Sequence, residues 1–138
     1  MAYPVAKSFD QAITGSLVAV KLWMPISVKS DVLPIDTLAE INIALPNTYI
    51  QEGVATSLGL EPTGKIFVST STKAKYEAYV FRLRVVLPDN NMVFEISAVE
   101  VPYMIRPQKR IRCLIGRDIL QFGTLLYSGP ANTFSLRF

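Results

Sequence analysis

The sequence predicts an all-β domain that contains one or two short helices. A period of two runs through residues 79–87 and again through residues 92–101, which is typical of strands. Between them lies Pro88-Asp89-Asn90-Asn91, a turn-forming sequence, so the two segments predict a long β-hairpin. Only residues 52–60 and 117–122 suit a helix, and both segments are short. A mostly antiparallel β fold follows from these observations.

The remaining elements of the first half are strands joined by polar connections. We expect strands at residues 17–28 and 38–44, and we interpret residues 34–37 as a turn that leads into the second of them. A further strand is expected at residues 65–70, because Pro62-Thr63-Gly64 before it is typical of a turn.

The C-terminal part predicts a buried strand, a sharp turn, a helix and two terminal strands. Cys113-Leu114-Ile115 is an apolar run that ends at Gly116, and the two last strands are expected at residues 124–129 and 133–138. Residues 1–15 show no clear period, so we expect them to form a loosely attached arm. No linker-like run divides residues 16–138, which predicts a single domain there.

Composition excludes several classes of enzyme. Half of the 138 residues are hydrophobic, which suffices for one core. The chain has no histidine and one cysteine, Cys113, which excludes Ser-His and Cys-His hydrolases, an intrachain disulfide and a typical zinc site. No glycine-rich phosphate loop occurs either, so we expect neither a metal nor a cofactor. We expect Cys113 to be buried and inert, which leaves carboxylates as the candidates for any chemistry.

Charge and hydropathy give further expectations about partners and location. The net charge is +3, and the basic side chains gather at Arg106, Lys109, Arg110, Arg112 and Arg117. Neither exposed aromatic residues nor a recognition helix accompanies them, so we do not expect nucleic-acid binding. We find no secretory signal pattern, and the longest apolar stretch is too short to cross a bilayer. We therefore expect a soluble, cytoplasmic protein that does not enter the membrane.

The order of residues from Cys113 to Leu120 resembles the closing motif of retropepsin-like aspartic peptidases. Leu114-Ile115-Gly116-Arg117-Asp118 is followed by Tyr127-Ser128-Gly129, as in one lobe of that family, and Asn47-Thr48-Tyr49-Ile50 is similar to the segment just after its catalytic loop. The resemblance covers residues 16–138 and implies a single-lobe acid-protease barrel. It also implies a possible homodimer with a shared groove for a peptide or protein ligand.

The same resemblance places the catalytic Asp-Thr-Gly of the family on Asn42-Ile43-Ala44. Aspartic peptidases need two carboxylates about 3 Å apart, one ionised to activate water and one protonated. A pair of Asn42 side chains supplies neutral amides, which bind water but do not deprotonate it. We therefore expect a degenerate catalytic site, with Asn42 in the place of the catalytic aspartate.

A rival alignment begins the catalytic loop at Ile35-Asp36-Thr37, with Leu38 where the family has glycine. It would make Asp36 the catalytic carboxylate of an active homodimeric endopeptidase. The alternative is that Asp36 is a solvated residue in a turn. Ser71, Thr72 and Lys73 fall where the family has the tip of a flap hairpin. These residues include no glycine, so two interpretations of the segment are kept: a flap and an ordinary exposed hairpin.

Gly116, Arg117 and Asp118 are expected to have structural roles. In the resembled family the arginine braces the catalytic loop through a carboxylate, and Pro46 occupies that carboxylate position here. We therefore expect either that Arg117 donates hydrogen bonds to backbone carbonyls or that Asp118 caps the helix. The leading hypothesis is an inactive retropepsin-like protein that acts by peptide binding or assembly. The alternatives are an active peptidase that uses Asp36 and a structural β-barrel module without a ligand groove.

Overall fold

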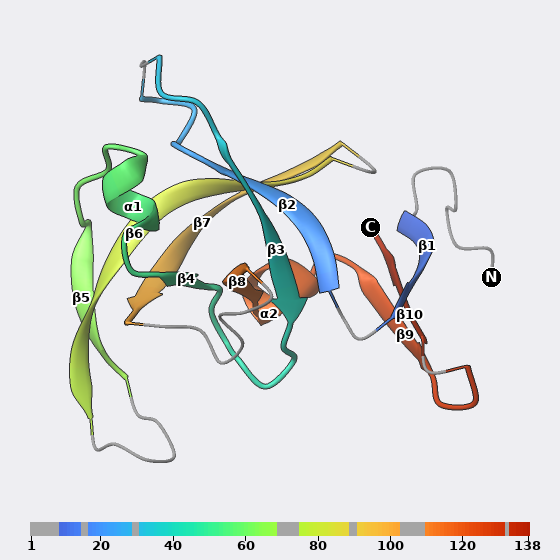
Figure 1. The fold of residues 1–138 in the computed structure, drawn as a ribbon. Coiled ribbons are helices and arrows are strands. Elements are labelled where there is room, and N and C mark those ends of the chain that lie inside the picture. Colours follow the sequence, from blue (N-terminus) through green and yellow to red (C-terminus); the bar gives the residue numbers. More distant parts are fainter. Residues whose placement is uncertain are drawn as a thin grey trace.

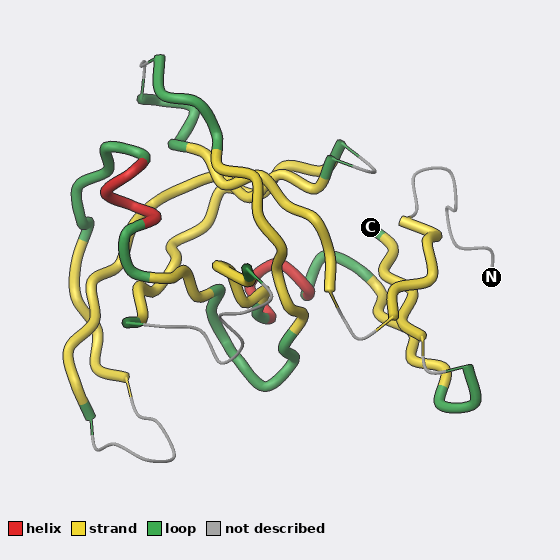
Figure 2. Tube along the Cα trace, viewed as in Figure 1, coloured by secondary structure: helices red, strands yellow, loops and turns green. Residues whose placement is uncertain are grey.

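A computed structural model of the chain describes residues 9–14, 17–28, 31–68, 75–88, 91–102, 110–131 and 133–138. Within these residues the chain is almost entirely β-structure, as Figures 1 and 2 show. The strands are β1 (Phe9–Thr14), β2 (Leu17–Trp23), β3 (Ile35–Ile41), β4 (Tyr49–Gln51), β5 (Gly64–Val68), β6 (Tyr76–Leu87), β7 (Met92–Val101), β8 (Ile111–Ile115), β9 (Thr124–Ser128) and β10 (Thr133–Arg137). The helices are α1 (Val54–Ser57) and α2 (Arg117–Leu120). The predicted all-β class with short helices is confirmed.

Six of the described strands close into a barrel. Their order is β2-β3-β8-β4-β7-β6, and β2 also pairs with β6, which completes the ring. β5 extends the sheet beyond β6 as an edge strand. Most neighbours are antiparallel, but β3 pairs with β8 and β4 pairs with β7 in parallel. This barrel is consistent with a retropepsin-like all-β lobe.

The predicted hairpin forms the longest antiparallel pair of the barrel. β6 and β7 are in register from Val80↔Val99 to Leu87↔Met92, and Asp89 and Asn90 of the predicted turn lie outside the described residues. On β6 the alternate residues Phe81, Leu83 and Val85 are buried, as a period of two requires.

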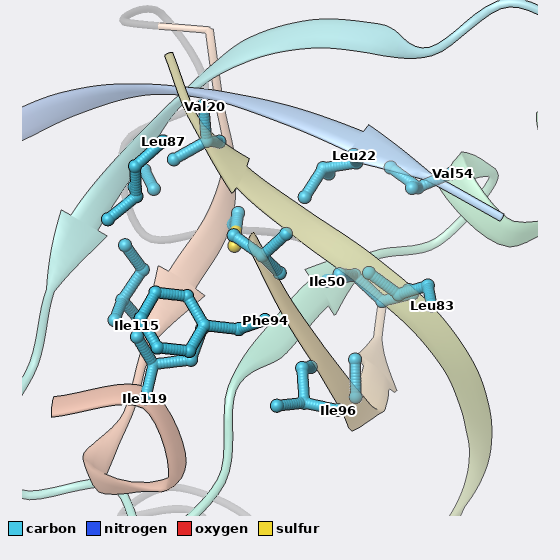
Figure 3. Packing of buried hydrophobic residues seen from close by; sticks show 14 of the residues in the cluster. Val20, Leu22, Ile50, Val54, Leu83, Leu87, Phe94, Ile96, Ile115 and Ile119 are labelled. Carbon is cyan, nitrogen blue, oxygen red and sulfur yellow. The ribbon is translucent and has the colours of Figure 1, made fainter. Parts of the chain in front are cut away.

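The barrel is filled by one apolar cluster to which nearly every element contributes. Figure 3 shows Leu22, Ile50 and Leu83 converging from three strands, with Phe94 and Ile119 closing the cluster near α2. Ile119 is fully buried, which explains why so short a helix is stable: packing of this side chain holds it rather than helix propensity. Leu136 on β10 is also fully buried and joins the same cluster.

A second sheet of three strands lies beside the barrel, in the order β1-β10-β9 (Figure 1). The two predicted terminal strands are therefore present and pair with each other. β1 was not predicted. It falls within residues 1–15, which we expected to be a loosely attached arm, but residues 9–14 pair with β10 instead. The reason is that the pairing partner lies more than 100 residues away, where no local pattern can indicate it.

Several predicted boundaries were wrong. Residues 35–37, expected in a turn, are the first residues of β3, because they pair with Leu22, Lys21 and Val20 on β2. β3 then ends at Ile41 rather than at residue 44. β2 ends at Trp23, ahead of Pro25, which has no N–H to donate to a neighbouring strand. Each predicted helix is also shorter than expected, because α1 and α2 contain four residues each.

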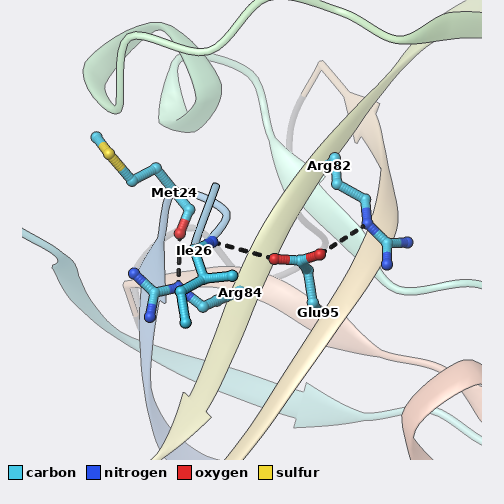
Figure 4. Close-up of polar contacts among 5 residues, drawn as sticks. All are labelled: Met24, Ile26, Arg82, Arg84 and Glu95. Atoms are coloured by element: carbon cyan, nitrogen blue, oxygen red, sulfur yellow. Dashed lines mark hydrogen bonds and ion pairs between the residues drawn. The ribbon is translucent and has the colours of Figure 1, made fainter. Parts of the chain in front are cut away.

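Polar contacts fix the segment after β2 onto the β6–β7 hairpin (Figure 4). The Arg84 Nε donates to the Met24 carbonyl oxygen at 2.7 Å, and the Ile26 N–H donates to Glu95 Oε1 at 3.1 Å. The second oxygen of Glu95 accepts from Arg82 Nε at 3.4 Å. All of these groups bond within the chain, so they account for the position of residues 24–28 and do not suggest a catalytic site. Nowhere in the described ranges is there a helix long and apolar enough to cross a membrane.

Candidate functional site

The candidate site is the loop of residues 42–48, which connects β3 to β4. The Asn42 N–H donates to the Ile115 carbonyl oxygen at 2.9 Å, which attaches the start of the loop to the end of β8. The side-chain oxygen Oδ1 of Asn42 then accepts from the Ala44 N–H at 3.0 Å. This is an Asx turn, in which asparagine imitates a backbone turn. It ends β3 and leaves Ile43 and Ala44 exposed at the surface.

Gly116 allows the corner between β8 and α2 to approach this loop closely. A Cβ atom at Gly116 would lie 2.5 Å from the Asn47 carbonyl oxygen and 2.9 Å from that of Leu45. Both are backbone atoms that a side chain cannot displace at small cost, so the position requires glycine. The constraint is one of space, since the backbone of Gly116 is extended.

Arg117 holds the same loop through two hydrogen bonds. Its backbone N–H donates to the Leu45 carbonyl oxygen at 2.8 Å, and its Nη1 donates to the Ile43 carbonyl oxygen at 2.9 Å. The guanidinium is bound to a backbone carbonyl, and among the described residues it forms no ion pair with a carboxylate. This leaves the exposed side chain of Arg117 as a cation beside the tip of the loop.

Asp118 and Thr48 form the buried part of the brace. Thr48 is fully buried, and its hydroxyl donates to Asp118 Oδ1 at 2.7 Å while its N–H donates to Oδ2 at 2.9 Å. The Ile119 N–H also donates to Asp118 Oδ1, at 2.9 Å. The Thr48 hydroxyl oxygen in turn accepts from the Gly116 N–H at 3.3 Å. Both carboxylate oxygens of Asp118 are thus occupied by the fold.

The structure brings together four of the residues singled out from the sequence: Asn42, Gly116, Arg117 and Asp118. Asp118 does not cap the helix, because Gly116 is the N-cap residue and Asp118 lies in the first turn. Sequence reasoning missed Thr48 as a member of the site. A threonine between an asparagine and a tyrosine gives no local signal that a partner 70 residues away will bury it.

Asp36 lies elsewhere. It is part of β3 and forms an ion pair with Lys21 on β2, with 2.9 Å between Nζ and Oδ1. Its side chain is 74% exposed. It lies six positions before Asn42, which corresponds to about 20 Å along an extended strand. Asp36 is solvated, as one of the two interpretations held, but it is in a strand and not in a turn.

Two other predicted groups lie wholly or partly outside the described residues. The flap candidates Ser71, Thr72 and Lys73 lie outside the described residues, as do Arg106 and Lys109 of the basic group. Arg110 and Arg112 are described, and both are exposed.

The buried cysteine fits its expected role. Cys113 is fully buried on β8, and burial, with a smaller contribution from the charge of Asp118, raises the pKa of its thiol far above the ordinary value. A thiol in this state is not a nucleophile. Among the described residues no group of three or more metal-binding side chains occurs.

The comparisons with known proteins give little beyond the fold. No protein-family model matches the sequence, and no curated protein is similar to it. Among solved structures, the retroviral protease-like domain of Ddi1 from Leishmania major is similar in fold, with a TM-score of 0.48 and 11% sequence identity over 89% of this chain and 94% of that chain.

Proposed function

We propose that this chain is a retropepsin-like domain without peptidase activity, which acts by binding an extended peptide or by assembly. One observation carries the proposal: hydrogen bonds with Arg117 and Asp118 hold the loop of residues 42–48 in place, yet the loop contains no carboxylate. The brace uses Gly116, Arg117 and Asp118 and does not depend on the identity of residues 43 and 44, whose contribution is backbone. A binding role explains why a loop that has lost its acid would keep its support.

Asp118 does not replace the missing acid. Its two oxygens accept three hydrogen bonds from Thr48 and Ile119. A general base must be free to take a proton from water at the reacting centre. The carboxylate nearest to the loop therefore has a structural task.

The edge strand β5 supports the peptide-binding part of the proposal. β5 is the last strand of its sheet, and its residues 64–67 are all exposed. Phe67 is 71% exposed, and Ile66 is 38% exposed. An exposed apolar edge is a template for strand addition, in which backbone hydrogen bonds give affinity and side-chain contacts give specificity.

The proposal is tested by measuring hydrolysis of an unfolded protein such as reduced, alkylated casein between pH 4 and pH 7. We expect no cleavage by the natural chain. Cleavage that is abolished in Asp36→Asn would establish the alternative, an active peptidase that uses Asp36. Cleavage that survives Asp36→Asn and disappears in Asp118→Asn would show instead that the acid of the brace is catalytic.

Assembly is tested separately by analytical ultracentrifugation. We propose a homodimer, so the sedimentation coefficient should rise with concentration over the micromolar range. A constant monomer value would remove the homodimer from the proposal and leave peptide binding.

A further inference from the structure

The orientation of the Asn42 amide indicates what the loop can bind. A backbone N–H only donates, so the atom that accepts from the Ala44 N–H must be the oxygen Oδ1 and not the nitrogen. The nitrogen Nδ2 is then the other terminal atom of the side chain, and the turn does not use it. Within the described part of the chain Nδ2 donates no hydrogen bond, and Asn42 is half-buried. The site therefore presents a fixed N–H donor in the place where a peptidase would present a carboxylate.

Arg117 adds a second donor at the same loop. Its Nη1 bonds the carbonyl of Ile43, the residue next to Asn42, and its guanidinium is exposed. Guanidinium has five N–H donors and no acceptor, so one bond to a carbonyl leaves donors available. Two donor groups thus flank the exposed turn at residues 43 and 44.

Among the described residues, no carboxylate is seen bonded to either of these donors. Residues 42–48 contain none, and the carboxylate of Asp118 is occupied by Thr48 and Ile119. Glu40, two residues before the loop, already has an interaction within the chain. The local chemistry favours a ligand that is an acceptor and carries negative charge.

We propose that the loop binds a carboxylate group of an extended peptide through Asn42 Nδ2 and Arg117; this inference rests on the proposed peptide-binding function. The carboxylate is either the C-terminus of the peptide or an acidic side chain within it. Hydrogen bonds from an amide and a guanidinium to a carboxylate are charge-assisted and therefore strong. Ile43, which is 64% exposed, supplies an apolar surface for the neighbouring residue of the peptide.

The test uses three hexapeptides of alternating alanine and valine, each labelled with fluorescein at its N-terminus. The first ends in a free carboxylate, the second ends in an amide, and the third ends in an amide but has glutamate in its third position. Binding to the full chain is measured by fluorescence anisotropy at low salt. We expect the first or the third peptide to bind about tenfold more tightly than the second. Whichever of the two binds more tightly identifies the source of the carboxylate.

Two variants assign the effect to the loop. Asn42→Asp keeps an oxygen for the Ala44 N–H but replaces the donor with a negative charge, so affinity for the preferred peptide should fall about tenfold or more. The matched control is Asn91→Asp, the same change at an exposed position in the β6–β7 turn, and it should leave the affinity unchanged within about twofold. Thermal melting of both variants shows whether each is folded.

The outcomes separate this inference from the function on which it rests. If none of the three peptides binds, the peptide-binding function itself is wrong. If all three bind equally, or if Asn42→Asp binds as tightly as the natural chain, the function stands and the carboxylate site is refuted. If Asn91→Asp loses as much affinity as Asn42→Asp, the loss is caused by the change in net charge, and the carboxylate site is refuted as well.

Discussion

Replacing Thr48 with valine should destabilise the protein by about 3 kcal/mol. Valine has nearly the shape of threonine but no hydroxyl, so the change removes two hydrogen bonds and leaves the backbone in place. One is the bond of the hydroxyl to Asp118 Oδ1 at 2.7 Å; a bond to a charged group is worth about 1.5–3 kcal/mol. The other is the bond that the hydroxyl oxygen accepts from the Gly116 N–H at 3.3 Å; leaving that buried donor unsatisfied costs about 1 kcal/mol or more.

The control is Thr48→Ser, which keeps the hydroxyl and loses only a buried methyl group, at a cost of about 1 kcal/mol. Equilibrium unfolding in urea measures both free energies, and the two-state assumption is checked by comparing fluorescence with circular dichroism. The brace predicts that valine is the worse replacement by about 2 kcal/mol. If the two variants agree within about 0.5 kcal/mol, the hydroxyl has no such role and the reasoning about the loop fails.

Three further predictions concern other parts of the fold. Gly116→Ala should cost about 3 kcal/mol in urea unfolding, since its Cβ would meet backbone at 2.5 Å, whereas Gly129→Ala, whose nearest neighbour is a ring atom at 3.8 Å, should cost less than about 1 kcal/mol; equal losses would contradict the close approach. Burial and the charge of Glu52 raise the pKa of Glu100 above its ordinary value of 4.5, against a hydrogen bond from Gly53. The folded state therefore binds this proton more tightly, and the resulting stability is present below pH 4.5 and lost as the pH rises through the raised pKa. Glu100→Gln should accordingly be more stable than the natural chain at pH 7 but not at pH 3. Thermal melting at both pH values tests this, and the same difference in melting temperature at pH 3 and pH 7 would contradict it. Finally, Cys113 should resist iodoacetamide at pH 8 in the folded protein and react once urea is added, and rapid labelling of the native chain in mass spectrometry would show that the thiol is accessible.

The fold was predictable where its cause is local. The alternation on both sides of residues 88–91 predicted the β6–β7 hairpin, because the side chains of a strand alternate between the core and the outside. The glycine after Cys113-Leu114-Ile115 predicted a sharp turn and a short helix, and both are present. Such features are properties of neighbouring residues, so the sequence displays them directly.

The sequence by itself determined the all-β class, the long hairpin and the absence of an acid from residues 42–48. Only the tertiary structure decided which residues meet. It placed Asp36 in a strand opposite Lys21, paired β1 with β10, and joined Thr48 to Asp118 across 70 residues. It also decided that the oxygen of the Asn42 amide faces the loop. These outcomes depend on contacts between segments that are distant in the chain, and the burial that makes them favourable exists only once the barrel has closed.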